Sequence, residues 1–406
     1  MSSIIFHIDV NSAFLSWTAV EKLKNGSDVD LRLIPSIIGG DMSRRHGVVL
    51  AKSLPAKAYG IQTGEPVVHA FRKCPGLVSE RPDHELYAKR SRELMNYLRS
   101  VCPDIEQVSI DECYMNFSPI ASRFSSPEAA AKEIKDHVRD AFGFTVNIGI
   151  SDKKVLAKMA SDFKKPDLVH TLYSSEIQEK MWPLPVSSLY MCGKSSVDTF
   201  RKLEILTIGD LANADPAILR LHLKSHGQLL WNYANGIDDS TVEPESPDLK
   251  GVGNSTTLSS DAATAADCKK VLLSLSDMVA SRLRASGQSA GMISTEIKYN
   301  TFQTISHQTT LPAPTCTASL IYETACALFD EIWNGTPVRL LGIRTSKLVS
   351  KDAPVQLRLF DYEMEKPKNE KLEKQDAALF DIRKKYGENS VVRGSFLNAP
   401  DECKKH

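Results

Sequence analysis

The sequence of 406 residues has no net charge, because 50 lysine and arginine residues balance 50 aspartate and glutamate residues. Proteins that coat nucleic acids are strongly basic, so this balance excludes a polybasic coat. It permits a local basic groove, in which the position of a few charges matters more than their total. Any binding to DNA must therefore come from charge placement.

Long hydrophobic runs and paired cysteines are also missing. No apolar segment approaches the ~20 residues of a membrane-spanning helix, so we expect no membrane insertion. The first residues, M-S-S-I-I-F-H-I-D, have no basic region and carry Asp9 inside the apolar run, unlike a signal peptide. The eight cysteines form no C-x-x-C pair and no zinc-ligand spacing, which favours reduced thiols and a cytoplasmic location.

The chain is too long for one compact core, and its first 172 residues alternate short strands with helices. Residues 4–10 are apolar and β-branched, which predicts a buried strand that ends near Asp9, and residues 12–23 have helical character. A Ser-Pro-Glu sequence at residues 126–128 predicts the start of a helix that Gly143 ends. A strand (144–150) and a helix (155–163) are predicted next. Residues 36–66 are rich in glycine and basic residues, which suggests loops around an anionic ligand.

The stretch S-I-D-E-C-Y-M-N-F, residues 109–117, places two adjacent carboxylates in what otherwise resembles a buried strand. Burying a charge is costly unless it is compensated, and a solvated turn is the simplest explanation of such a pair. If Asp9 joins Asp111 and Glu112 at the end of one sheet, the three acids are typical of a divalent-cation site. We then expect the metal, not the protein, to neutralise them. We also expect the backbone to turn there, since neighbouring strand residues face opposite sides.

After about residue 173 the pattern changes to short helices. The segment M-C-G-K-S-S-V-D-T-F-R-K-L-E-I-L-T-I-G-D-L-A, from Met191, has the spacing of a helix-hairpin-helix that binds phosphates through main-chain N–H groups. The sequence of this segment is equally compatible with a plain helical hairpin that binds no phosphate. Residues 243–248 contain two prolines and no apolar run, which indicates a linker.

The remaining elements follow the order of a split β-α-β, ferredoxin-like domain. The predicted elements are a strand (254–259), a helix (265–286), two strands (291–311), a helix (316–334) and a strand (338–348). We interpret residues 361–406 as an appended, partly mobile tail with one helix near residues 377–386.

Three motifs occur in the order H-I-D-V-N-S-A-F, S-I-D-E and G-I-S-D-K-K-V-L-A-K-M-A-S-D-F-K-K-P. Together they resemble the Y-family translesion DNA polymerases, specifically the bacterial DinB/UmuC branch, over roughly residues 4–360. The resemblance implies an α+β, multidomain right-hand polymerase. Its parts would be a ferredoxin-like palm (1–12 and 80–172), small fingers (13–79), a helical helix-hairpin-helix thumb (173–240), a linker (241–250), a βαββαβ little-finger domain (251–350) and a C-terminal tail with a clamp-binding peptide (351–406).

The resemblance also implies roles for individual residues of the active site. Asp9, Asp111 and Glu112 would hold two magnesium ions, with manganese as the alternative metal and the Val10 carbonyl as a further ligand. Phe14 would be the steric gate, whose ring beneath the sugar leaves no room for a 2′-hydroxyl. Without the motif, Phe14 would be interpreted as an ordinary core residue.

Binding of the triphosphate is implied for Lys165, which would otherwise be a solvated lysine at a helix end. Many relatives have Tyr-x-x-Arg in the fingers, where this chain has Leu54 and Lys57. A lysine keeps the charge but loses the bidentate fork of arginine. The grip on the triphosphate is then expected to be weaker or shared with nearby residues, namely Lys52, Ser53 and Arg45.

The expected DNA contacts lie in the thumb and little finger. Relatives usually carry Gly-Ile-Gly at the thumb hairpin, whereas this chain has Cys192-Gly193-Lys194, so we expect one main-chain phosphate contact to be altered. Charges on exposed strands are often merely solvated, which is the alternative for the little-finger candidates. The candidate contacts are Gly193, Lys194, Lys298, Arg339, Arg344 and Lys347.

The peptide Q-L-R-L-F, residues 356–360, resembles the bacterial sliding-clamp-binding peptide. Leu357, Leu359 and Phe360 would anchor it in apolar pockets and Gln356 would fix its orientation. The same five residues are also compatible with an edge strand or with the start of a helix. The expected partners are therefore primer-template DNA, dNTPs and the bacterial β sliding clamp, and we expect a monomer.

The resemblance implies template-directed, low-fidelity DNA synthesis past damage, without a proofreading domain. A non-catalytic, clamp-tethered DNA-binding accessory is the alternative, but it would have no reason to retain Asp9, Asp111 and Glu112 as clustered like charges. A palm-type nucleotide cyclase, suggested by Gly-Gly-Asp at residues 39–41, ranks third because that tripeptide precedes a basic loop and no hairpin acid pair.

Overall fold

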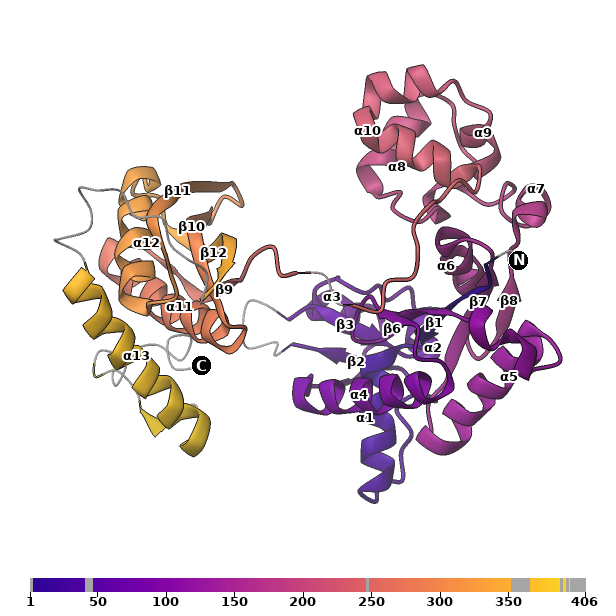
Figure 1. Cartoon of the computed structure of the whole chain (residues 1–406), viewed down its shortest axis with the longest axis horizontal. Helices are drawn as coiled ribbons and strands as arrows, with labels where there is room; N and C mark the ends of the chain where they lie inside the picture. The colour runs from indigo at the N-terminus through magenta and orange to yellow at the C-terminus, as the bar shows by residue number, and fades with distance from the viewer. Residues whose placement is uncertain are drawn as a thin grey trace. The chain divides into compact units, whose positions relative to one another are not determined.

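The computed structural model describes residues 3–40, 47–245, 248–351 and 366–387, together with residues 390, 391 and 394. The chain divides into two compact units (Figure 1); described residues up to 245 belong to the first and those from 248 to the second. Each unit combines a sheet with helices, which confirms the predicted α+β class. No helix in these described ranges is long and apolar enough to cross a membrane.

Five strands form the central sheet of the first unit: β1 (Ile5–Val10), β5 (Ile105–Gln107), β6 (Glu112–Asn116), β7 (Val146–Ser151) and β8 (Val169–Thr171). Their order is β5-β6-β1-β7-β8, and β1 is antiparallel to both of its neighbours. In this register Asp9 lies opposite Glu112 on one side and Asn147 on the other. The central strand therefore carries the first acid of the predicted site between two polar partners.

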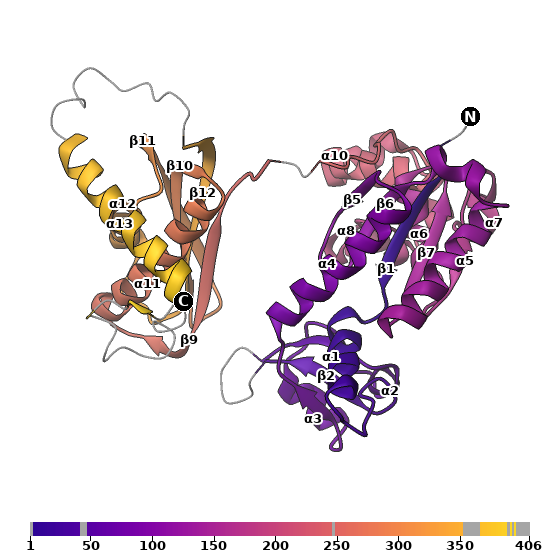
Figure 2. The same ribbon diagram turned by 60° about the horizontal axis from the view of Figure 1, so that its bottom comes forward.

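Helices pack on both faces of this sheet. The apolar side chains Phe6 and Ile8 face the core formed with α4 (His84–Val101) and α5 (Pro127–His137), which Figure 2 shows beside β1. Helix α6 (Lys154–Asp162) packs on the opposite face. It approaches closely because Gly149 has no side chain: a Cβ there would lie 2.0 Å from the Ala157 carbonyl oxygen. The polar residues of β1 therefore face α6.

The predicted bounds of α5 agree with its caps. Ser126 accepts a hydrogen bond from the backbone N–H of Ala129 at 3.1 Å. A π turn, Val138–Phe142, continues the helix as far as Gly143, whose φ of 79° ends it. Other short turns of 3₁₀ type are Ser118–Arg123, Ser174–Glu176 and Val186–Ser188.

A smaller sheet follows β1 in the sequence, with strand order β3-β2-β4. Its elements, with the helices around it, are α1 (Ala13–Lys24), β2 (Ser36–Gly39), β3 (Val49–Lys52), α2 (Leu54–Ala58), α3 (Val67–Lys73) and β4 (Val78–Glu80). Ile37 and Val49 fill the core beneath this sheet. The end of β3 and the start of α2 thereby gain a fixed position.

Short helices form the last part of the first unit: α7 (Ile177–Lys180), α8 (Lys194–Lys202), α9 (Ile208–Ala212) and α10 (Pro216–Ala234). Phe200, Ile208 and Leu230 are fully buried in their shared core. Helix α10 is interrupted at Lys224, where φ is 55°. The predicted boundaries of palm, fingers and thumb stay predictions.

The second unit contains the predicted strand and helix order. Its elements are β9 (Gly253–Ala262), α11 (Ala265–Ala285), β10 (Gln288–Tyr299), β11 (Thr304–Thr315), α12 (Ala318–Ile332) and β12 (Val338–Ser350). The strands pair in the order β11-β10-β12-β9, all antiparallel. Helices α11 and α12 cover one face, on which Ile293, Ile297 and Leu341 are buried. The other face carries polar side chains.

The interpretation of residues 361–406 as an appended tail is wrong for its helix. Helix α13 spans Lys366–Tyr386, so it begins before the predicted residue 377. Asp376 is 7% exposed, pairs with Arg284 at 2.7 Å and accepts a hydrogen bond from the Ala318 N–H at 2.8 Å. A helix residue from the tail thus caps α12, whose own cap residue Thr317 makes no side-chain cap bond.

Candidate active site

A pocket of about 500 Å³ opens beside the end of β1 and the segment that joins β3 to α2. Its lining includes many of the predicted site residues: Asp9, Val10, Phe14, Ser53, Lys57, Asp111 and Lys165. It also includes Lys52 and Leu54, together with Asn11, which the sequence analysis did not select. Glu112 does not line this pocket. Sequence positions up to 156 residues apart therefore meet in one cavity.

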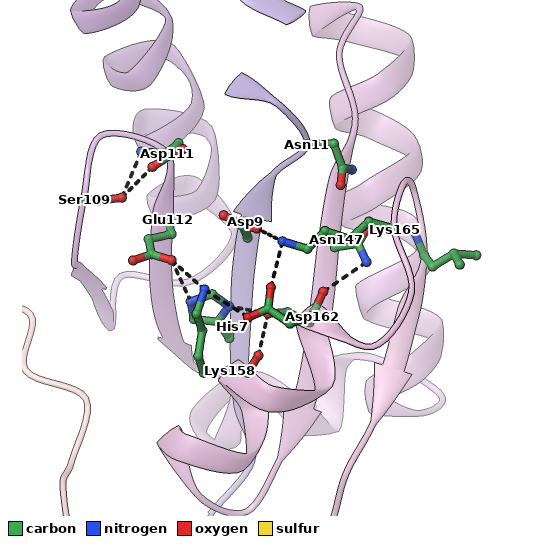
Figure 3. Close-up of polar contacts among 12 residues, drawn as sticks. His7, Asp9, Asn11, Ser109, Asp111, Glu112, Asn147, Lys158, Asp162 and Lys165 are labelled. Carbon is green, nitrogen blue, oxygen red and sulfur yellow. Dashed lines mark hydrogen bonds and ion pairs between the residues drawn. The ribbon is translucent and has the colours of Figure 1, made fainter. Parts of the chain in front are cut away.

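Asp9 is paired with a lysine of the protein. The Lys165 ammonium contacts Asp9 and lies 2.8 Å from Asp162 Oδ1 (Figure 3). Burial acts to lower the pKa of Lys165, but Asp9 and Asp162 outweigh it and raise that pKa. Asn147 Nδ2 donates to the Lys164 carbonyl at 2.7 Å, so the loop that carries Lys165 is attached to β7.

Asp111 lies in the turn between β5 and β6, as predicted for the acid pair. The backbone N–H of Val10 donates to the Asp111 carbonyl at 3.0 Å, and Ser109 Oγ donates to the Asp111 carboxylate at 2.6 Å. Burial, together with the charges of Asp9 and Glu112, raises the pKa of Asp111, although the bond from Ser109 opposes the rise. Within the described ranges, Asp111 forms no ion pair. It is therefore the acid in greatest need of a cation.

Glu112 begins β6 and faces α6. Lys158 Nζ lies 2.8 Å from its carboxylate and His7 Nε2 lies 3.4 Å away (Figure 3). The contact with His7 and the ion pair with Lys158 lower the pKa of Glu112 to about 2. Burial lowers the pKa of His7, so this imidazole is neutral, and 3.4 Å is long for a hydrogen bond. We therefore assign the larger share of the effect to the shorter ion pair with Lys158.

These contacts correct the prediction that a metal alone neutralises the acids. Lys165 neutralises Asp9 and Lys158 neutralises Glu112, because both lysines project from α6 and the loop after it. Among the described residues, no group of three acids, histidines or cysteines is arranged to hold a metal ion. The described side chains of Asp9, Asp111 and Glu112 therefore lie near one another without converging on one point, and their role as metal ligands stays a prediction.

The oxygen atoms around the pocket nevertheless fit a hard cation. Asp9, Asp111 and Val10 line it, and the Oδ1 atom of Asn11 is buried there without a hydrogen-bond partner among the described residues. Magnesium prefers such oxygen ligands. Asp111, as the unpaired carboxylate, together with Asp9 would hold the metal, and Glu112 would have to leave Lys158 to join them.

Phe14 belongs both to the pocket and to the core. Its ring is stacked on Tyr87, with 4.3 Å between ring centroids and 5° between planes. Tyr87 is fully buried and its hydroxyl lies 3.1 Å from Thr18 Oγ1. The ring of Phe14 is therefore supported from the core and also lines the cavity, and its role as a steric gate stays a prediction.

The cationic side of the pocket consists of Lys52 and Lys57. Burial, with a contribution from the Lys57 charge, lowers the pKa of Lys52. Ser53 uses its hydroxyl inside the protein: it donates to the Ile34 carbonyl at 2.7 Å and accepts from the Ala56 N–H at 3.0 Å. Arg45 lies outside the described residues. Lys52 therefore lies in the pocket beside Lys57, and its share in binding a triphosphate stays a prediction.

The predicted thumb hairpin has an unusual backbone conformation just before the Gly193-Lys194 pair. Gly193 caps α8 with an ordinary φ of −75°, and Lys194 begins the helix. The left-handed conformation falls on Met191, with a φ of 68°. No pattern of side-chain chemistry marks this residue, since methionine disfavours that conformation.

The other predicted DNA contacts lie in the second unit. Arg344 lines a pocket of about 620 Å³ on the open face of the sheet. Lys347 donates a hydrogen bond to Thr310 at 3.1 Å. Lys298 and Arg339 meet at the ring of Phe302. The predicted clamp-binding residues Gln356, Leu357, Leu359 and Phe360 lie outside the described residues.

Known proteins match this chain along most of its length. The impB/mucB/samB family matches residues 8–162, and the C-terminal domain of that family matches residues 249–359. DNA polymerase IV of Clostridium acetobutylicum is 46% identical over 402 residues, which cover 99% of this chain and 100% of the relative. DNA polymerase IV 1 of Bacillus subtilis is 36% identical over 408 residues, which cover 100% of this chain and 95% of the relative.

A solved structure shares the fold. The Y-family DNA polymerase chimera Dbh-Dpo4(243-245)-Dbh has a TM-score of 0.74 at 20% identity and covers 86% of this chain and 99% of its own. The fold is thus that of the right-hand Y-family polymerases. The chain belongs to the impB/mucB/samB family and, within it, to the bacterial DinB-like Y-family polymerases. The predicted family is confirmed.

Proposed function

We propose that this polymerase extends a DNA primer from dNTPs on a DNA template and that Asp9, Asp111 and Glu112 are its catalytic acids. Membership of the family makes the chain a DNA-directed, translesion DNA polymerase and does not favour the accessory alternative. The observation that supports the residue assignment is the meeting of Asp9 and Asp111 with Phe14 and three lysines around one pocket. Acids, a sugar-sized aromatic face and cations are what a nucleotidyl transfer from a triphosphate requires.

Two magnesium ions, with manganese as a substitute, would activate the primer 3′-hydroxyl and balance the charge of the phosphates during in-line displacement. Asp9, Asp111 and the Val10 carbonyl would hold them. Glu112 would complete the ligand set after separating from Lys158. The raised pKa of Asp111 supports this assignment, because a cation next to that carboxylate would relieve the repulsion from its two acidic neighbours.

Lys165 acts first as a counter-ion and then as a ligand of the substrate. Without nucleotide it pairs with Asp9, which keeps a partly buried carboxylate neutralised. A triphosphate in the pocket offers Lys165 more negative charge than Asp9 does, so Lys165 moves to the phosphates and frees Asp9. Lys57 and Lys52 bind the same group from the opposite side.

Phe14 selects the sugar. Because Tyr87 supports its ring from behind, Phe14 cannot retreat to admit a 2′-hydroxyl without disturbing a fully buried residue. Ser53 holds the start of α2 in place beside the pocket through its internal hydrogen bonds.

The DNA would contact Gly193 and Lys194 in the thumb and the basic residues on the second unit. Residues 356–360 would bind the bacterial β sliding clamp through their leucine and phenylalanine side chains. We infer that the protein works as a monomer in the bacterial cytoplasm, where primer-template DNA, dNTPs and the clamp are found.

Primer extension with magnesium and all four dNTPs tests this proposal. Asp111→Asn keeps the shape of the side chain and its acceptor for Ser109, but removes the charge. We expect extension by the wild type and none by Asp111→Asn, while both bind primer-template DNA. Asp140→Asn, at an exposed acid remote from the pocket, is the matched control and should extend normally. Extension by Asp111→Asn at the wild-type rate would refute the assignment, and binding without extension by the wild type would favour the accessory alternative.

A further inference from the structure

An exposed aromatic residue lies in a strained position at the turn between β10 and β11. Phe302 is 63% exposed and has a φ of 68°, a left-handed conformation that residues with a side chain rarely adopt. The turn is anchored, because the Phe302 N–H donates to the Tyr299 carbonyl and the Tyr299 N–H donates to the Gln303 carbonyl, both at 2.9 Å. The buried Tyr299 in turn donates its hydroxyl to the Ile332 carbonyl at 3.1 Å. The ring therefore has a defined position in the second unit.

Two cations lie over this ring. Lys298 Nζ is 5.3 Å from the ring centroid and Arg339 Cζ is 4.9 Å from it. They come from neighbouring strands, since Lys298 of β10 lies opposite Leu340 of β12, the residue after Arg339. Neither forms an ion pair with an acid in the described ranges. Two positive charges are thus kept together, although they repel each other.

The exposed, left-handed position of Phe302 is explained better by the contacts of its ring with Lys298 and Arg339 than by a contribution to protein stability. Burial of Phe302 contributes little, because most of its surface stays in contact with water. The backbone conformation at that position is itself unfavourable. The negative face of the aromatic ring attracts both cations and fixes their spacing.

We propose that Phe302 is a positioning residue for a phosphate-binding site formed by Lys298 and Arg339, and that this site binds the sugar-phosphate backbone of DNA. The inference rests on the proposed function in that it takes primer-template DNA as the ligand. The planar guanidinium of Arg339 matches two phosphate oxygens, and the Lys298 ammonium adds a point charge. Because the ring already holds both cations, little ordering remains to be done when the phosphate arrives.

The same sheet supports DNA over a free phosphate ion as the ligand. Arg344 projects from the open face of β12 and lines the groove there, so a further cation follows the same surface. A continuous polyanion can contact both places, whereas a single phosphate ion can contact only one. We assign this contact to the sugar-phosphate backbone of DNA. We do not assign it to a base stacked on Phe302, since Lys298 and Arg339 already lie over that ring.

The test measures the dissociation constant of the full chain for a primer-template duplex over a range of salt concentrations. Phe302→Leu keeps an apolar side chain but removes the aromatic face, and Phe302→Trp keeps that face. We expect Phe302→Leu to weaken binding about five-fold at low salt and to reduce the salt slope by about one, whereas Phe302→Trp stays near the wild type. In a Lys298→Ala/Arg339→Ala background, Phe302→Leu should change nothing further.

Further variants separate this role from effects on folding and catalysis. Phe302→Gly relieves the left-handed backbone, so weak DNA binding by this variant, with an unfolding free energy no lower than that of the wild type, would assign the loss to the ring. Wild-type affinity and salt slope in Phe302→Leu would overturn the proposal, as would an equal loss in the Lys298→Ala/Arg339→Ala background. Competition by inorganic phosphate at constant ionic strength, without an effect of Phe302→Leu on DNA binding, would identify a free-ion site and also overturn it. The binding assay needs no catalysis, so failure of primer extension by the wild type would leave this result readable.

Discussion

Replacement of Lys158 tests which group controls the charge of Glu112. The pKa of Glu112 is about 2, against an ordinary value of 4.5, a difference that corresponds to about 3 kcal/mol. Lys158 lies 2.8 Å from the carboxylate, and an opposite charge at this range lowers a carboxyl pKa by about 1–3 units. We expect Lys158→Met to raise the pKa of Glu112 by about one to two units and to remove about 1–3 kcal/mol of stability at neutral pH.

The pKa of Glu112 can be measured by carbon NMR of the metal-free protein labelled at its glutamate carboxyl groups. Because the folded pKa of Glu112 lies below the unfolded value, its contribution to the free energy of unfolding is present above about pH 4.5. It is lost as the pH falls from there towards 2. In Lys158→Met this loss should be smaller. The free energy of unfolding measured with urea should therefore differ less between pH 7 and pH 3 in the variant than in the wild type.

Lys154→Met is the matched control, because Lys154 lies on the same helix but pairs with Glu106 at 2.6 Å. This variant should leave the pKa of Glu112 unchanged. An unchanged pKa in Lys158→Met would refute the reasoning. It would assign the depression to His7, despite its neutral state and longer contact.

Three other substitutions test separate parts of the structure. Met191→Gly should raise the unfolding free energy by about 1 kcal/mol, since it relieves a left-handed backbone, and a lower thermal midpoint would contradict this. Glu296→Gln removes a negative charge from the open face of the little-finger sheet and should tighten DNA binding about two-fold at low salt, whereas Glu331→Gln on the helical side should not. Asp376→Asn leaves the partly buried Arg284 without its counter-ion and should cost about 1–3 kcal/mol, visible as faster hydrogen exchange in α13; unchanged exchange would show that the helix is held by other contacts.

Local signals made most of the fold predictable. The strand predicted at residues 4–10 is β1, Ile5–Val10, because alternation and β-branched residues mark a buried strand. The helix predicted from Ser126-Pro127 begins there, because a serine cap and a proline at the first helical position act within one turn. The β-α-β-β-α-β order of the second unit follows from similar signals, which depend on residues close together in the sequence.

Contacts between distant residues were not predictable in the same way. Lys158 and Lys165 both belong to a motif that the sequence shows, but their pairing with Glu112 and Asp9 is not visible there. The pairing depends on the close approach of α6 to the sheet, and the missing side chain of Gly149 permits that approach. The docking of α13 involves Asp376, which is one aspartate among many charged residues of a polar segment. Its partner Arg284 is 92 positions away, and no periodicity connects the two.

The three acids of the site have three different electrostatic states, and this difference explains why a strand can tolerate them. Asp9 shares a lysine that the substrate can withdraw, Glu112 has a lysine held within the fold, and Asp111 has no cation among the described residues. Repulsion is thereby concentrated at Asp111, which lines the pocket. Binding of a triphosphate would remove Lys165 from Asp9 and leave two uncompensated carboxylates side by side, so the attraction for metal ions should rise when the nucleotide arrives. The substrate and the metal would then favour each other's binding through the charge of one lysine.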